Sequence, residues 1–157
     1  MMRKIIAAAG LVALSAVAAH AATATGNLSV SVTITASCAV TNGTLSFGSN
    51  AASALSAIID ASGSFLVNCT TNAPYSVTLG NGANFSSGRR MSDGGTNYVN
   101  YDIYTSAART TSWSGATAVT GTGSGADQTI NVYGRIPSGQ SVPTGSYSDT
   151  VGITVTY

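Results

Sequence analysis

The chain has 157 residues, a formal net charge of +1 and only 7% charged residues. So weak and balanced a charge gives no attraction to nucleic acid or to anionic lipid, and we expect neither as a partner. About half of the residues after position 21 are Ser, Thr, Asn or Gly, a mixture that disfavours helices and suits strands and turns.

Residues 1–21 have the form of an export signal. Basic residues at positions 3 and 4 precede an apolar run over residues 5–19, and Ala19-His20-Ala21 resembles a cleavage site. The apolar run is too short for a comfortable membrane span. We therefore expect a signal peptide over residues 1–21 and a mature protein outside the cytoplasm.

Residues 22–36 contain a regular alternation of apolar and small polar side chains. Leu28, Val30, Val32 and Ile34 share one face, with Ser or Thr between them. Successive side chains of a strand point to opposite faces, so the segment predicts a strand with one apolar face that needs a partner. That partner is either the chain's own domain or another chain.

Cys38 and Cys69 are the only cysteines. In an exported protein an isolated pair favours a disulfide over a metal site or a nucleophile. The bond would close a loop of roughly 30 residues, for which the chain-entropy model gives about 3–4 kcal/mol of stabilisation.

Further short alternating segments follow the first cysteine. We expect strands over residues 43–48, 64–71, 75–79, 98–104 and 129–136, a weak strand within 113–126, and a loop or brief helical turn over 50–59. The last expected strand covers residues 147–157. One face of it holds Val151, Ile153, Val155 and Tyr157.

Several short strands without a credible helix predict an all-β fold, an antiparallel β-sandwich in a single domain. The final strand has no following residues to cover its edge, and a comparable strand lies near the other terminus. A protein with one exposed edge and one spare strand can polymerise head to tail by strand addition.

No catalytic set is predicted. Without residues 1–21 the chain has no His, Lys or Glu, which excludes Ser–His–Asp and Ser–Lys arrangements. Asp93 and Asp102 are interpreted as solvated turn and strand ends rather than as a glycosidase pair, and Arg89-Arg90 as a solvated loop pair. We expect no enzyme activity, no metal site and no cofactor.

Tyr98, Tyr101, Tyr104 and Trp113 allow two interpretations. They form either a platform for a sugar or aromatic packing between strands, and packing is favoured.

Taken in order, several short motifs resemble those of the spore coat protein U domain. They are Cys38, Gly43–Gly48, Val67–Thr70, Pro74–Val77, Arg90-Met91, Tyr98–Tyr104, Trp113, Val132–Pro137, Gly145–Asp149 and Val155–Tyr157. Together they cover essentially the whole chain after the signal.

The resemblance implies a subunit of an archaic chaperone–usher pilus, used for adhesion and biofilm formation. The fold it implies is an incomplete immunoglobulin-like sandwich that lacks its last strand, over residues 37–157. The implied donor strand lies in residues 22–36, and the two cysteines match the family's disulfide. The implied acceptor cleft is edged by the last strand, with Val151, Ile153, Val155 and Tyr157. Implied partners are identical subunits, a periplasmic chaperone and an outer-membrane usher, and the resemblance also admits a tip adhesin.

A second function stays open. In it the protein is a self-contained secreted module that binds a carbohydrate or a surface, with residues 26–36 folded back into their own domain. For the pilus subunit, by contrast, the resemblance implies export through the periplasm to the cell surface.

Overall fold

The computed structural model describes residues 21–157. The predicted signal peptide lies almost wholly outside this range, so its cleavage stays a prediction. The chain divides into two units, one ending at Thr33 and one over Ile34–Tyr157, and each is described by itself. Within the described range, no helix is long and apolar enough to cross a membrane.

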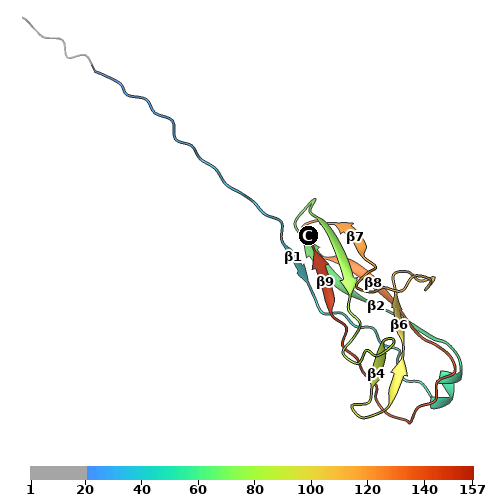
Figure 1. Ribbon diagram of the computed structural model, residues 1–157. Helices are drawn as coiled ribbons and strands as arrows, with labels where there is room; N and C mark the ends of the chain where they lie inside the picture. Colours follow the sequence, from blue (N-terminus) through green and yellow to red (C-terminus); the bar gives the residue numbers. More distant parts are fainter. Residues whose placement is uncertain (1–20) are drawn as a thin grey trace, which may run out of the picture. The chain divides into compact units, whose positions relative to one another are not determined.

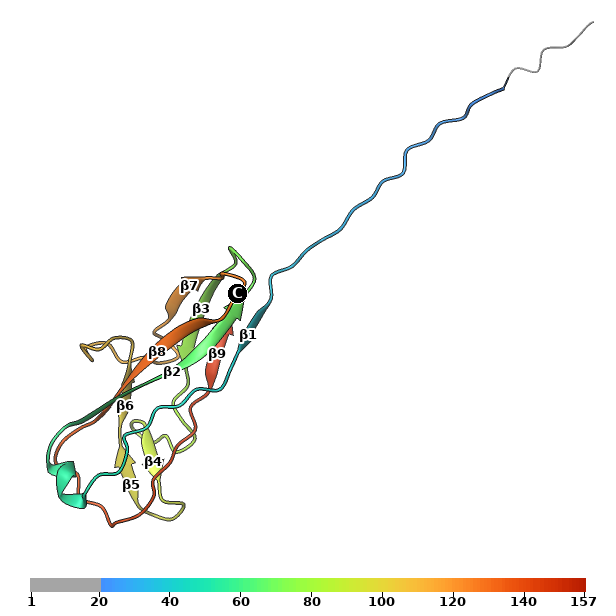
Figure 2. The same ribbon diagram turned by 180° about the vertical axis from the view of Figure 1, so that it is seen from behind.

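The second unit consists almost entirely of short strands (Figures 1 and 2). In chain order the elements are β1 (Cys38–Val40), the 3-10 helix η1 (Ala52–Ser56), β2 (Ile59–Cys69), β3 (Pro74–Leu79), β4 (Arg90–Ser92), β5 (Tyr98–Asn100), β6 (Asp102–Tyr104), β7 (Val119–Thr122), β8 (Gln128–Ile136) and β9 (Ile153–Thr156).

The strands form three antiparallel sheets. The largest has the order β1-β2-β8-β6, the second has the order β7-β3-β9, and β4 pairs with β5 alone. The longest pairing joins β2 to β8, from Ile59 opposite Ile136 to Val67 opposite Gln128. The edge strands β1 and β9, from different sheets, lie near one another (Figures 1 and 2).

This strand order is that of an immunoglobulin-like sandwich. In such a fold one sheet has the order A-B-E-D and the other contains C, F and G. Here β1, β2, β8 and β6 take the places of A, B, E and D, while β3 and β9 take those of C and F. None of the residues 21–157 forms a strand at the place of G, beside β9. The predicted all-β sandwich is confirmed.

The core lies between the two larger sheets and is filled by alternate residues of their strands, as the period of a strand requires. The buried apolar residues include Phe65, Val67 and Cys69 of β2, Tyr75, Val77 and Leu79 of β3, and Val132 and Ile136 of β8. Trp113 is fully buried, and its indole N–H donates to the Val77 carbonyl at 3.1 Å. These faces agree with the predicted alternation.

The predicted strand over residues 98–104 is interrupted at Tyr101. Its backbone N–H donates to the Arg89 carbonyl at 3.0 Å instead of to a neighbouring strand of either sheet. The chain thereby passes from the small β4–β5 sheet to the edge of the largest sheet, where β6 pairs with β8.

The interpretation of Arg89 as a solvated loop residue is wrong. Its side chain is 4% exposed and forms a 2.9 Å ion pair with Asp102. The remaining guanidinium N–H groups donate to the carbonyls of Gly80 and Trp113, both at 2.6 Å. A planar fork of donors can join three acceptors in this way, so Arg89 connects the start of β6 to the chain after β3 and to the chain at Trp113. Arg90 lies over the Tyr98 ring, 4.0 Å from its centroid.

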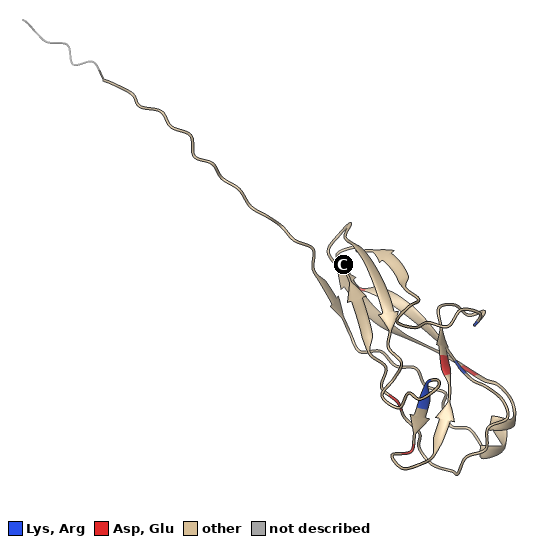
Figure 3. Ribbon diagram, in the orientation of Figure 1, with Lys and Arg blue, Asp and Glu red and all other residues tan. Residues whose placement is uncertain are grey.

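Charged residues are few and lie away from the second sheet (Figure 3). Neither β3 nor β9 contains one. On the other sheet, Asp60 accepts two hydrogen bonds from Arg135, at 2.7 and 2.8 Å, and these hold the pKa of the Asp60 carboxyl below its usual value.

Candidate functional site

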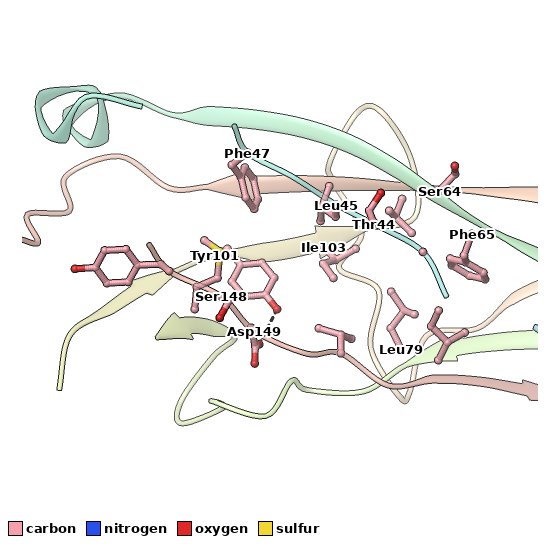
Figure 4. A pocket seen from close by; sticks show the side chains of 16 residues that line it. Thr44, Leu45, Phe47, Ser64, Phe65, Leu79, Tyr101, Ile103, Ser148 and Asp149 are labelled. Carbon is pink, nitrogen blue, oxygen red and sulfur yellow. Dashed lines mark hydrogen bonds between the residues drawn. The ribbon is translucent and has the colours of Figure 1, made fainter. Parts of the chain in front are cut away.

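A groove of about 280 Å³ opens between the segment Gly43–Phe47 and the chain leading into β9. Its floor is apolar and comes from the core, with Phe65, Leu79, Ile103 and Val132. Figure 4 shows these walls approaching the floor from opposite sides. The groove therefore gives direct access to the core beside the place where strand G would lie.

One wall of the groove is the segment Ser148–Thr156, which bonds to the domain through its even-numbered residues. Their backbone partners are Ser92 for Ser148 (2.8 and 2.9 Å), Ala83 for Thr150 (3.0 Å) and Gly80 for Gly152 (2.8 Å). The pairing of β3 with β9 continues this alternation through Thr154 and Thr156. The edge is thus one extended segment, although only its last part is a strand of the sheet.

The odd-numbered residues of this wall consequently direct their backbone N–H and C=O groups away from β3, toward the free edge. Val151 and Ile153 line the groove, and Val155 packs against the core. Tyr157 is 59% exposed. Strand edges are commonly protected by charge or proline, and β9 has neither. This edge can accept a further strand.

The facing wall approaches β2 closely because of two glycines. A Cβ on Gly43 would stand 2.6 Å from the Ser64 carbonyl oxygen, and one on Gly63 would collide with the Thr44 carbonyl. Only a residue without a side chain allows the two backbone segments to approach so closely. This approach brings Leu45 and Phe47 over the core, as the sequence pattern predicts, although a single bridge between Thr44 and Ser64 replaces the expected strand.

One end of the groove is polar. The Tyr101 hydroxyl donates to Asp149 at 2.7 Å, and Asp149 also accepts from the backbone and side-chain N–H groups of Asn84, at 3.1 and 3.2 Å. Burial of Tyr101, and then its bond to the Asp149 carboxylate, raise the pKa of the phenol well above its usual value. No local sequence pattern predicts this network, because Asn84, Tyr101 and Asp149 come from three separate parts of the chain.

Residues 21–37 form neither strand nor helix. The four predicted donor side chains are almost fully exposed, at 88% for Leu28, 84% for Val30 and Val32, and 85% for Ile34. These four side chains form a row of exposed apolar groups without a partner among the described residues.

A disulfide between Cys38 and Cys69 fixes the chain where this segment ends. Just before it, Ser37 accepts a hydrogen bond from the Thr70 N–H at 2.9 Å, and its own N–H donates to the Thr70 hydroxyl at 3.0 Å. Ser37 is therefore bonded to Thr70 just beyond the last pair of β1 and β2, although neither residue belongs to a strand. The predicted disulfide is confirmed.

Residues 24–154 match the family model for the Spore Coat Protein U domain. The chain belongs to the Spore Coat Protein U domain family. It is also 38% identical to Protein U of Myxococcus xanthus, over 172 aligned positions that cover 98% of this chain and 94% of that protein. The resemblance predicted from the motifs is confirmed.

Among solved structures, the fold is similar to a chain in the CsuC–CsuE chaperone–tip adhesion subunit pre-assembly complex, from the archaic chaperone–usher Csu pili of Acinetobacter baumannii. The TM-score is 0.54 at 22% sequence identity, with 80% of this chain covered. The matched part is 40% of that chain's length. At this identity the likeness concerns the fold.

In this Spore Coat Protein U domain the aromatic cluster is mostly structural. Trp113 is fully buried and Tyr101 is 7% exposed, so neither presents a ring face to a ligand. Phe65 and Trp113 pack with ring centroids 6.1 Å apart, and Phe47 meets Tyr101 edge-on at 6.2 Å. The packing interpretation holds for the two buried rings.

Proposed function

We propose that this protein is a structural subunit of an archaic chaperone–usher pilus, in which residues 22–36 of one copy fill the groove of the next. The observation that carries the proposal is the presence, in one chain, of an exposed alternating segment and an apolar groove beside a free strand edge. In this arrangement Leu28, Val30, Val32 and Ile34 point into the groove.

The spacing of the two parts supports this pairing. Apolar residues two apart in a strand repeat about every 6.6 Å, on the donor segment as on the wall formed by Val151, Ile153 and Val155. Fully extended, residues 22–36 reach about 50 Å at roughly 3.3 Å per residue, enough to run the length of such a domain. The backbone groups of the odd-numbered wall residues would bond the incoming strand.

The energy of this insertion is large. Burying four aliphatic side chains at about 1.5–3 kcal/mol each gives on the order of 6–12 kcal/mol before the cost of ordering the segment. That range is comparable to the whole stability of an ordinary domain. We therefore expect a subunit without a donor to be barely stable.

Donation to another copy is favoured over folding back. A return of the segment beside β1 requires a reversal of the chain, and residues 28–37 contain no Gly, Pro, Asn or Asp to make one. The hydrogen bonds between Ser37 and Thr70 also continue the direction of β1. These features speak against the alternative of a self-contained carbohydrate- or surface-binding module.

The proposed partners are those that the resemblance to subunits of archaic chaperone–usher pili implies. A periplasmic chaperone would lend a strand to the groove, and an outer-membrane usher would direct its exchange for the segment of the next subunit. A tip adhesin would occupy the end of the fibre. The route is export through the periplasm to the cell surface, where the fibre serves adhesion and biofilm formation. The role is structural rather than enzymatic.

A pair of substitutions on neighbouring residues tests this proposal. Val32→Asp places a carboxylate in the apolar groove and is expected to abolish fibres, since an unpaired buried charge costs several kcal/mol. Ser31→Asp adds the same charge on the opposite face and is expected to leave fibres largely intact. The measurement is the ladder of multimers resistant to sodium dodecyl sulfate in shear fractions from cells. Equal ladders from both variants would contradict the proposal.

A further inference from the structure

A second hollow, of about 500 Å³, lies on the domain away from the exposed edge of β9. It is lined by the loop after β3, the junction of β5 and β6, and the end of β8, with Asn81, Phe85, Asn100, Asp102 and Arg135 among its residues. Its volume falls within the range of small-molecule sites. Tyr101 lines both this hollow and the groove described above, and it lies between them.

The charged groups of this hollow are already engaged in ion pairs, although Asp60, the partner of Arg135, is shared with Arg109 at 3.4 Å. Asp102 is paired with Arg89 at 2.9 Å and also accepts from the Ser112 hydroxyl at 2.6 Å. Arg135 is paired with Asp60 at 2.7 Å. A charged ligand would have to compete with these pairs, so the hollow suits a neutral one.

Its uncommitted polar groups are side-chain amides. Among residues 21–157, no hydrogen bond engages the side chain of Asn81 or that of Asn100. The backbone of Asn100 is held instead, since its N–H and carbonyl bond the Gln140 amide at 2.7 and 2.9 Å. An amide offers donors and an acceptor side by side, which matches a ligand rich in hydroxyls.

Phe85 adds an apolar surface at this hollow. Its side chain is 46% exposed and lines the hollow. The preceding residue is fixed on two sides, because Asn84 donates to Asp149 at 3.1 Å and accepts from Arg90 at 2.9 Å. The ring therefore stands on an anchored loop, ready to stack on a flat apolar face.

We propose that this hollow binds a neutral saccharide, with the Phe85 ring against the face of a sugar and the amides of Asn81 and Asn100 bonding its hydroxyls. Both faces of a sugar ring carry C–H groups and its rim carries hydroxyls, so an aromatic ring beside free amides fits it. Because the hollow is separate from the groove, binding does not require that the subunit be a monomer.

The test uses the full chain as it is secreted, applied to an array of neutral, sulfated and sialylated glycans. Neutral glycans are expected to bind, and Phe85→Ala and Asn100→Ala are each expected to weaken that binding about tenfold or more. Ile58→Ala is the matched control, since Ile58 is also an exposed apolar residue, at 54%, and lies outside the hollow. Unchanged near-ultraviolet circular dichroism checks that each variant is folded.

Three results would overturn this proposal. One is the absence of binding to any neutral glycan, and another is binding to acidic glycans alone. The third is an equal loss of binding in Ile58→Ala, which would place the binding surface elsewhere.

Discussion

The hydroxyl of Tyr101 donates a 2.7 Å hydrogen bond to the carboxylate of Asp149. Tyr101 comes from the junction of two strands, while Asp149 lies on the edge segment that forms one wall of the groove. The bond therefore attaches that edge to the interior through a side chain, between the points where Ser148 and Thr150 are bonded to the domain through their backbones. This wall of the groove is therefore in place without a further strand beside β9.

The stability of the domain is expected to fall when the pH rises above about 10, the ordinary pKa of a tyrosine. The pKa of Tyr101 is raised in the folded protein, by burial and by the Asp149 carboxylate, so the folded state resists its ionisation. Its contribution is complete below the unfolded pKa and is lost as the pH rises toward the folded one.

Tyr101→Phe removes this ionisable group. The loss of unfolding free energy between about pH 8 and about pH 11, measured with denaturant, is expected to be smaller in this variant than in the parent chain. The other tyrosines are common to both chains and cancel in the comparison. Identical alkaline losses in the two chains would contradict the assigned environment of Tyr101.

Arg89→Ala is expected to destabilise the domain by about 2–3 kcal/mol, because the carbonyls of Gly80 and Trp113 lose their donor and Asp102 loses one of its partners. Arg90→Ala is the matched control, since Arg90 is the next residue, is only half-buried at the start of β4 and stacks on Tyr98. A loss of about 1 kcal/mol or less is expected for it. Chemical unfolding of both variants checks the difference, and equal losses would mean that the Arg89 network is unimportant.

Replacing Cys38 and Cys69 together by Ser is expected to lower the unfolding free energy by about 3–4 kcal/mol, since the disulfide closes a loop with a sequence separation of 31. The variant is also expected to yield less fibre, because the start of β1 is held beside β2 at this point. Thermal unfolding and fibre yield from cells measure the two effects. Free thiols in the assembled protein would contradict the role given to this bond.

The sequence predicted the faces of the strands better than their extents. Alternation placed Phe65, Val67 and Cys69 correctly in the core because the period of a strand is local. The alternation over residues 147–157 predicted one continuous strand. In the structure Ser148 bonds to β4, whereas Ile153–Thr156 pair with β3. This change of partner depends on residues far away in the sequence.

Electrostatic contacts were the least predictable part. Arg89 follows the loop 80–88 and precedes another arginine, which is typical of a solvated position, but the fold brings the carbonyls of Gly80 and Trp113 and the carboxylate of Asp102 around it. The groove was predicted only along Val151 to Tyr157. Its facing wall depends on the close approach of Gly43 and Gly63, which no local pattern reveals.

The central claim, that residues 22–36 complete the sandwich of a neighbouring copy, is tested most directly by moving this segment behind Tyr157 with a short flexible linker. The chain is expected to fold as a stable monomer without multimers resistant to sodium dodecyl sulfate, since each groove is then filled from within. The same chain carrying Val32→Asp in the moved segment serves as control and is expected to be unstable. A third chain, from which residues 22–36 are deleted, gives the opposite test. The claim would be contradicted if this chain unfolded at the same temperature as the parent and still assembled into fibres.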